Sequence, residues 1–188
     1  AGTSYSDTAV TGGTTYHYVV SGVNSAGEGP NSSQASATPV SAPPPGSGTG
    51  LKGQYYNNID FTALKKTRTD ATINFDFGNG SPVPGMGSDT FSIRWTGEVQ
   101  GQFSETYTFH TITDDGVRLW VNGQLIIDRW FDQGATEWTG NIALNAGQRV
   151  SIQMDYYENG GGASARLQWS SPSQTRQVVP QTQLYPAP

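Results

Sequence analysis

Apolar and polar positions alternate with a period of two through most of the chain after residue 50. The alternation is clearest over residues 91–95, 107–111, 117–121 and 150–156. Successive side chains of a β-strand point to opposite faces, so this pattern predicts strands with one buried face. No stretch sustains the period of an amphipathic helix. The pattern therefore predicts an all-β fold, an antiparallel β-sandwich over residues 51–188.

A β-hairpin is predicted around Asn122 and Gly123. Both residue types tolerate positive φ, as a two-residue type I′ turn requires, and strand-like sequence lies on both sides of them. In the first strand, residues 117–121, the apolar side chains share one face, while Arg118 and Trp120 lie on the other. The hairpin is thus expected to present one face to the core and one to its surroundings.

The chain divides into three predicted segments: an N-terminal part over residues 1–39, a linker over residues 40–50, and the β domain over residues 51–188. The linker begins with a run of prolines, which is stiff, and continues with alternating glycine, which is flexible. Within the β domain, residues 51–56 read as the first strand. Residues 61–69 are expected to form a loop with a short helical turn.

The N-terminal part contains, in this order, Gly13-Thr14-Thr15-Tyr16, Tyr18, Val20, Val23-Asn24, Ala26-Gly27 and Ala37-Thr38-Pro39. In these residues and their spacing it resembles the C-terminal half of a fibronectin type III domain. The resemblance implies that Tyr16 makes the tyrosine corner of that family. It covers only the last three strands, which cannot close a two-sheet sandwich. We therefore expect this truncated fragment to pack on the following domain or on another chain.

Composition excludes several classes of function. With 24 Gly, 11 Pro and 34% hydrophobic residues the chain favours many turns over long helices. A net charge of −5 with 13% charged residues, and no basic run among aromatics, argues against nucleic-acid binding. No apolar run is long enough for a membrane span, and no export leader begins the sequence. Cysteine avoidance and the polar, aromatic-rich composition suit an exported bacterial module, so we expect an extracellular or cell-surface location.

Asp114 and Asp115 stand directly before the hairpin. Two like charges on neighbouring residues repel unless solvent or a cation neutralises them. The chain has no cysteine and only two histidines, so a thiolate or typical zinc site is excluded, and oxygen ligands favour a hard cation such as calcium. Consecutive carboxylates diverge and do not suit glycoside hydrolysis, and no other catalytic motif is present, so no enzyme activity is predicted. From these residues alone, a solvated turn remains an alternative.

Several separated motifs follow one another along the β domain: Gly53-Gln54-Tyr55-Tyr56, Phe91-Ser92-Ile93-Arg94-Trp95-Thr96-Gly97, Tyr107-Thr108-Phe109, Asp114 through Gly123, Ile127-Asp128, and Asp155-Tyr156-Tyr157-Glu158 through Leu167-Gln168-Trp169. Taken together, they resemble the PA-fourteen (PA14) domain family, named for the anthrax protective antigen. The resemblance covers residues 51–186 and implies a β-sandwich of the kind found in exported bacterial and fungal proteins. In sugar-binding members, two successive aspartates joined by a cis peptide bind a calcium ion that coordinates sugar hydroxyls, and an asparagine from a second loop completes the protein ligands.

Carried over to this chain, the resemblance assigns Asp114 and Asp115 to the paired calcium ligands. The second loop then corresponds to residues 157–163, with Asn159 as the candidate side-chain ligand. The register of this glycine-rich loop is ambiguous, so Glu158 is a further candidate, and a plain hairpin turn is the alternative for Asn159.

Two aromatic residues are candidates for contact with a sugar ring. Tyr157 is the preferred one, and Trp130 flanks an acidic, polar loop, although packing between loops is an alternative for the aromatics there. The expected function is that of a calcium-dependent carbohydrate-binding module. It would bind a polysaccharide or oligosaccharide as part of a larger secreted, bacterial, glycan-active enzyme or adhesin. The alternative is a non-catalytic spacer or protein-interaction module with a structural calcium site or none.

Overall fold

The computed structural model describes residues 4–39 and 46–188, which belong to two compact units, 1–42 and 43–188. Residues 40–45 of the predicted linker lie outside the described residues. The remaining linker residues pair with the end of the second unit, because the N–H groups of Gly48 and Gly50 donate to the carbonyls of Thr182 and Leu184 at 3.0 Å each.

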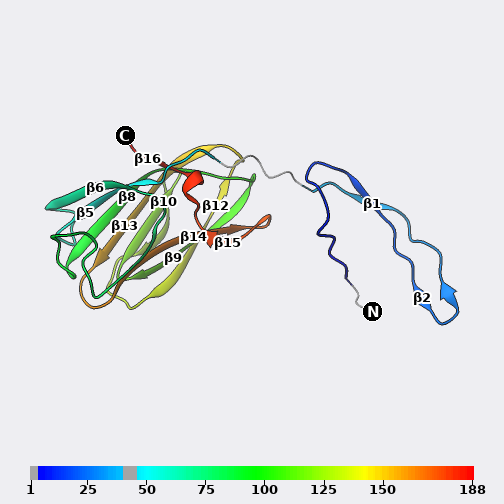
Figure 1. Ribbon diagram of the computed structural model, residues 1–188, viewed down its shortest axis with the longest axis horizontal. Helices are drawn as coiled ribbons and strands as arrows, with labels where there is room; N and C mark the ends of the chain where they lie inside the picture. The colour runs from blue at the N-terminus through cyan, green and yellow to red at the C-terminus, as the bar shows by residue number, and fades with distance from the viewer. Residues whose placement is uncertain (1–3, 40–45) are drawn as a thin grey trace. The chain divides into compact units, whose positions relative to one another are not determined.

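The second unit is the antiparallel β-sandwich that the alternation predicts (Figure 1). In the seven-stranded sheet the order is β11 (Gln124–Arg129), β10 (Val117–Val121), β13 (Arg149–Glu158), β8 (Phe91–Gln100), β5 (Leu51–Tyr56) and β6 (Leu64–Asp70), and β16 (Leu184–Pro186) also pairs with β8. In the five-stranded sheet the order is β12 (Thr136–Leu144), β9 (Glu105–Asp114), β14 (Ala163–Ser171) and β15 (Gln174–Val178), and β7 (Asn74–Gly78) also pairs with β14. A 3-10 turn, η1 (Gln181–Gln183), precedes β16. Among the described residues, no helix has the length and apolar character needed to cross a membrane.

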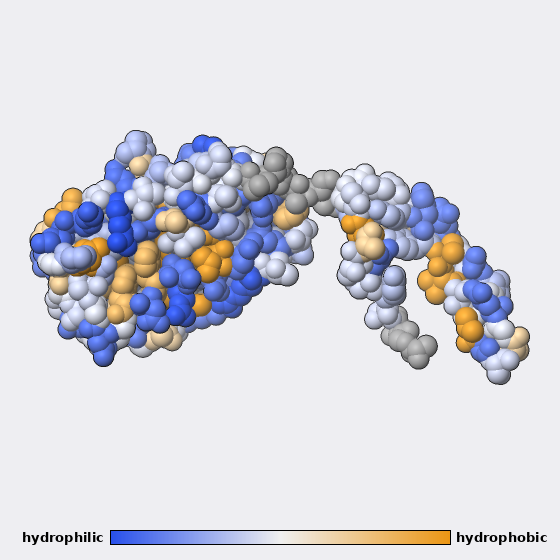
Figure 2. Space-filling view, in the orientation of Figure 1, coloured by the Kyte–Doolittle hydropathy of each residue, from blue (hydrophilic) through white to orange (hydrophobic). Residues whose placement is uncertain are grey.

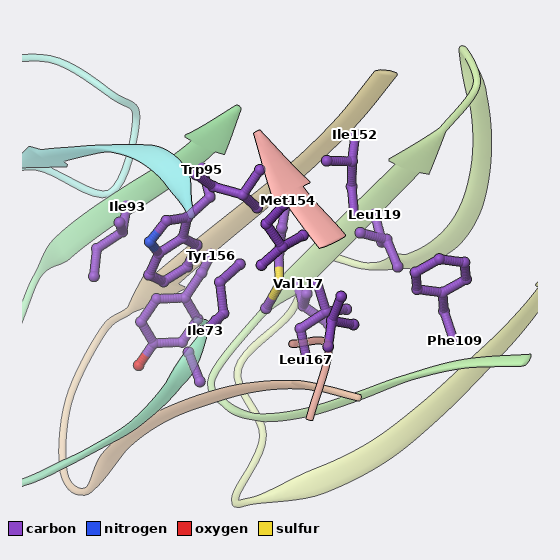
Figure 3. Packing of buried hydrophobic residues seen from close by; sticks show 14 of the residues in the cluster. Ile73, Ile93, Trp95, Phe109, Val117, Leu119, Ile152, Met154, Tyr156 and Leu167 are labelled. Atoms are coloured by element: carbon purple, nitrogen blue, oxygen red, sulfur yellow. The ribbon is translucent and has the colours of Figure 1, made fainter. Parts of the chain in front are cut away.

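The core lies between the inward faces of the two sheets (Figure 3). Trp95, Met154 and Tyr156 of the seven-stranded sheet lie opposite residues of the five-stranded sheet such as Phe109 and Leu167. All five side chains are almost completely excluded from solvent. Burial of each large apolar side chain contributes about 1.5–3 kcal/mol. The period-two pattern of the sequence is therefore the pattern of core-facing positions.

The predicted hairpin joins β10 to β11. Asn122 and Gly123 have φ angles of 50° and 73°, as a type I′ turn requires. A bulge between Leu119 and Trp120 shifts the register, so that Trp120 lies opposite Leu125. The hairpin prediction is confirmed.

The loop expected over residues 61–69 is wrong over most of its length. Residues Leu64–Asp70 form β6, the edge strand that pairs with β5. Most of its side chains are exposed and polar, because an edge strand need not bury either face of its middle part. The sequence of β6 therefore lacks the apolar alternation by which a strand is predicted. Only Phe61 and Ala63, with φ angles of 61° and 57°, mark the turn that precedes it.

The first unit consists of two short ladders. Strand β1 (Tyr16–Tyr18) pairs with β4 (Ala35–Ala37), and β2 (Val23–Asn24) pairs with β3 (Gly27–Glu28). The Thr11 N–H donates to the Tyr16 hydroxyl at 2.8 Å, which is the type of upstream contact that a tyrosine corner makes. Apolar residues lie at the surface of this unit (Figure 2), and Val20 is 73% exposed. The fibronectin type III resemblance stays a prediction.

Candidate metal centre

Three carboxylates converge where strands of the two sheets end. Asp114 is the last residue of β9, Asp115 follows it, and Glu158 is the last residue of β13. The link from Asp115 to β10, which pairs with β13, brings the ends of these strands together. One oxygen from each carboxylate lies within 4.8 Å of the other two. The peptide bond between Asp114 and Asp115 is cis, as the family resemblance implies.

Two loops fix the orientation of the Asp115 carboxylate, which is only 4% exposed. Its Oδ1 accepts the N–H of Gln133, and its Oδ2 accepts the N–H of Asn159, both at 2.8 Å. The hydroxyl of Thr113 donates to the Asp115 main-chain oxygen at 2.8 Å. Each carboxylate oxygen can accept more than one contact, so Asp115 retains capacity toward an ion.

Glu158 is completely buried, yet its Oε1 has no well-formed hydrogen bond within the described parts of the chain. The Gly160 N–H lies near enough to this carboxyl to lower its pKa, but burial outweighs that effect. Its Oε2 lies 3.4 Å from the Tyr156 hydroxyl, which donates a shorter bond of 2.5 Å to the Asp114 main-chain oxygen. A buried carboxylate without a partner is costly. This oxygen of Glu158 is therefore an acceptor that remains available to an ion.

The electrostatics of the cluster favour a cation. Burial, and then the charges of Asp115 and Asp114, raise the pKa of Glu158 to about 8. Burial and the Asp115 charge also raise the pKa of Asp114. Through residues 4–39 and 46–188, no arginine, lysine or histidine forms an ion pair with any of the three carboxylates. The all-oxygen donor set suits a hard divalent cation such as Ca²⁺, so these residues fit the ion that the family implies.

Asp132 connects the two loops beside the cluster. Its Oδ1 accepts the Tyr157 hydroxyl at 2.7 Å, and its Oδ2 accepts the side-chain Nδ2 of Asn159 at 2.8 Å. The amide of Asn159 thus turns its nitrogen to Asp132, which leaves its Oδ1 as the available ligand atom. Asn159 itself is exposed and lies next to Glu158 in the chain.

The two predicted sugar-stacking residues pack against each other. Tyr157 is 5% exposed, and its ring lies edge-on to Trp130 with the centroids 4.6 Å apart. Trp130 also stacks on Phe61 at 5.7 Å and carries the Arg118 guanidinium at 4.8 Å from its ring. This packing leaves little of the Tyr157 ring open to a ligand. The ring is placed to support the loop. Phe131, 49% exposed, is the aromatic residue of this loop that is open to solvent.

Sequence reasoning missed Asp132 and Gln133 as parts of the site. The usable signal was the hairpin: β11 returns antiparallel to β10, so the loop that follows Arg129 must come back to the residues that precede Val117. An acidic residue and an amide in such a loop are well placed to meet the aspartate pair.

An open cleft of about 200 Å³ lies beside Asp114. Its walls include Asp76, Gly162 and Arg166, and the guanidinium of Arg166 pairs with Asp76 at 3.2 Å. A Cβ built on Gly162 would lie 3.8 Å from Asp114 Oδ2, so the loop passes close to that carboxylate. The cleft gives a ligand access to the Asp114 side of the cluster.

Comparison with known proteins places the sandwich in one family. The model of the PA14 domain matches residues 47–183. The anti-sigma-I factor RsgI3 of Acetivibrio thermocellus is 53% identical over 142 residues, which is 76% of this chain but only 22% of that protein. The chain thus corresponds to a part of this longer relative.

Solved structures show the same fold. A structure described as an anti-sigma factor domain-containing protein is 52% identical, with a TM-score of 0.73, over 74% of this chain and 49% of that chain. A structure described as the PA14 sugar-binding domain from an RTX adhesin is 21% identical, with a TM-score of 0.61, over 74% of this chain and 99% of that chain. The latter likeness shows the fold alone.

Proposed function

Because the chain belongs to the PA14 domain family, we propose that residues 46–188 form a non-catalytic, calcium-dependent carbohydrate-binding module. The observation that carries the proposal is the carboxylate cluster. Asp114, Asp115 and Glu158 offer oxygens within 4.8 Å of one another, and the buried Glu158 has an oxygen without a hydrogen-bond partner among the described residues. A divalent cation would neutralise charges that no side chain neutralises among the described residues.

The site has protein ligands for the ion and open positions for the sugar. Asp114, Asp115 and Glu158 hold the ion, and the exposed loop of Asn159 supplies a further oxygen. Calcium takes six to eight oxygen ligands, so these residues leave positions to which vicinal hydroxyls of a sugar can bind. The fold shared with the sugar-binding domain of an RTX adhesin supports a glycan as the ligand.

The parent protein is proposed from the relatives of higher identity. Two of them, the anti-sigma-I factor RsgI3 and the anti-sigma factor structure, are 53% and 52% identical to this chain. This favours a regulatory chain over the glycan-active enzyme or adhesin expected from the sequence. The sugar-binding surface would then lie outside the cell or at its surface.

Calcium binding tests the first half of the proposal. We expect titration calorimetry of the chelator-treated chain to detect calcium, and differential scanning calorimetry to show a rise in Tm with calcium, because a ligand of the folded state stabilises it. Asp115→Asn should abolish both signals. Glu98→Gln is the matched control, since Glu98 is an exposed carboxylate that pairs with Ser151, near the opposite end of β13 from Glu158.

Glycan binding tests the second half. Arrays of plant, fungal and bacterial glycans, probed with calcium and with chelator, should include at least one glycan whose binding chelation removes and Asp115→Asn lacks. A chain that binds calcium but none of these glycans would support the spacer alternative with a structural ion. If chelator removed the binding of none of these glycans, the metal-bridged mechanism would be contradicted.

A further inference from the structure

A second hollow lies on the outer face of the seven-stranded sheet. This groove of about 450 Å³ is lined by residues of β8, β10 and β13, by the hairpin turn and by Ala187, which follows β16. The side chains that matter here are those of Thr96, Trp120, Ser151 and Gln153. None of these residues takes part in the carboxylate cluster. The groove is therefore a separate feature from the candidate metal centre.

Strand register aligns the outward side chains into a row. Leu125 pairs with Trp120, Trp120 with Gln153, Gln153 with Thr96, and Thr96 with Lys52. Residues paired across strands point to the same face of a sheet. The row therefore crosses five strands from β11 to β5, and the groove lies over its middle.

Trp120 differs from the other tryptophans of the chain. Trp95 and Trp169 are fully buried, Trp130 packs on Phe61 and Tyr157, and Trp138 packs on Phe131. Trp120 is half-buried on the outer face, and in the described ranges its ring has no aromatic or guanidinium partner and its N–H no acceptor. An indole with an apolar face and a free donor is available to a ligand that is partly apolar and partly polar.

Gln153 is held in position beside the indole. Its Nε2 donates to Asp155 Oδ1 at 3.0 Å, and Asp155 is itself fixed by two bonds of 2.7 and 2.6 Å from Arg94. The amide oxygen of Gln153 is left to accept a bond from a ligand. The hydroxyls of Thr96 and Ser151 lie in the same groove and can donate or accept.

Charge sets the class of ligand. No residue that lines the groove has an ionisable side chain. Lys52 ends the same row and donates to the Pro188 main-chain oxygen, and the exposed Glu98 pairs with Ser151 in one neighbouring row. The other neighbouring row carries Arg94, Arg118, Asp128 and Asp155. Those four charges are paired with one another, at 2.6 Å for Arg94 with Asp155 and 2.8 Å for Arg118 with Asp128. The groove thus complements a neutral molecule with many hydroxyls and an apolar face.

We propose that this groove binds a neutral glycan chain without calcium, with one sugar ring over Trp120 and its hydroxyls on Gln153, Thr96 and Ser151. The sugar ring provides an apolar C–H face for the indole and hydroxyls for the fixed amide and the two side-chain hydroxyls. This site goes beyond the metal-bridged site and does not require it. A chain with both sites engages a polysaccharide at two places, which raises its avidity.

Titration of the full chain in excess chelator tests the proposal. The probes are cellohexaose, xylohexaose and mannohexaose, with hexagalacturonate as the charged comparison, and binding is measured by calorimetry. We expect at least one neutral hexasaccharide to bind, Trp120→Ala and Gln153→Ala to weaken it by about tenfold or more, and Trp120→Phe to retain most of it. Gln124→Ala, an exposed change in the same hairpin, is the control and should leave binding unchanged. Because the titration is done in excess chelator, binding here is measured without the proposed metal centre, which separates the two sites.

Several results would overturn the proposal. They are no binding of any neutral hexasaccharide in chelator, a preference for hexagalacturonate, and neutral binding that Trp120→Ala and Gln153→Ala leave intact. Sedimentation velocity tests whether a second copy of this chain occupies the groove instead. Self-association that Trp120→Ala abolishes, with glycan binding unaffected, would show that it does. Unfolding curves of each variant show whether a loss of binding reflects the groove or the fold. If Trp120→Ala does not fold, Gln153→Ala decides the outcome.

Discussion

Glu158 makes the stability of the metal-free domain depend on pH. Its carboxyl has a pKa of about 8 in the folded chain, whereas the pKa of an unfolded glutamate is about 4.3. The folded state therefore holds a proton that the unfolded state has released between these two values. Stability from this group is full below the lower pKa and is lost as the pH rises through the higher one.

We therefore expect the domain in chelator to have a lower Tm at pH 9 than at pH 6, measured by calorimetry. Glu158→Gln should flatten this dependence, because the amide does not ionise. Saturating calcium should reduce or reverse it, because the ion binds the ionised carboxylates. A chelated wild-type chain whose Tm rises from pH 6 to pH 9, with Glu158→Gln behaving identically, would contradict this role of Glu158.

The sequence predicted the aspartate pair because two adjacent carboxylates before a hairpin can be recognised from the order of residues alone. It named Glu158 only as a substitute for Asn159, since the order of residues in a glycine-rich loop does not say which one turns inward. The burial of Glu158, with its free oxygen, is a consequence of β13 ending under the loop. Tyr157 was expected to face a ligand, but the direction of its ring depends on Trp130 and Asp132, which are distant in the sequence.

At the scale of elements, close packing of β10 and β13 positions the site. The Tyr157 N–H donates to the carbonyl of Gly116 at 3.1 Å, and the Tyr157 ring covers that glycine. A Cβ at Gly116 would lie 2.2 Å from Tyr157 Cε1, so any side chain must displace the ring. The ring carries the hydroxyl that binds Asp132, and through it the loop that orients Asp115.

Gly116→Ala should therefore destabilise the chain by about 1–3 kcal/mol, as overpacking in a filled site does. It should also weaken calcium binding, although Gly116 is not a ligand. Urea unfolding and calcium titration measure the two effects. Gly134→Ala is the control, since a Cβ there meets no atom within 4 Å. Equal stability of the two variants would show that the Tyr157 ring is free to move aside.

The strands with the longest buried faces were predicted, whereas β7, β12, β15 and the edge strand β6 were not. Alternation records burial, and the middle of β6 is exposed on both faces, so its polar sequence has the composition of a loop. The bulge between Leu119 and Trp120 was equally hidden, because a one-residue shift in pairing leaves no mark in residue type. That bulge decides which residue lies beside Trp120.

At the scale of the whole molecule, the two units differ in what can hold them together. Every buried apolar residue of the described chain lies in the second unit, from Leu51 to Leu184. In the first unit, the described residues 4–39 form only two short ladders, and Val20 and Val23 are largely exposed. Ladders of this length without a core do not offset the entropy of ordering the chain.

We therefore expect residues 43–188 to fold alone. In calorimetry this fragment should unfold in one cooperative transition, with the same rise in Tm on calcium addition as the full chain, because the carboxylate cluster and both sheets lie within it. Residues 1–42 alone should show no cooperative transition and little dispersion in an NMR spectrum. A lower Tm for the fragment than for the full chain would instead show that the first unit contributes to the stability of the second, as the expected packing of the truncated N-terminal segment on the following domain requires.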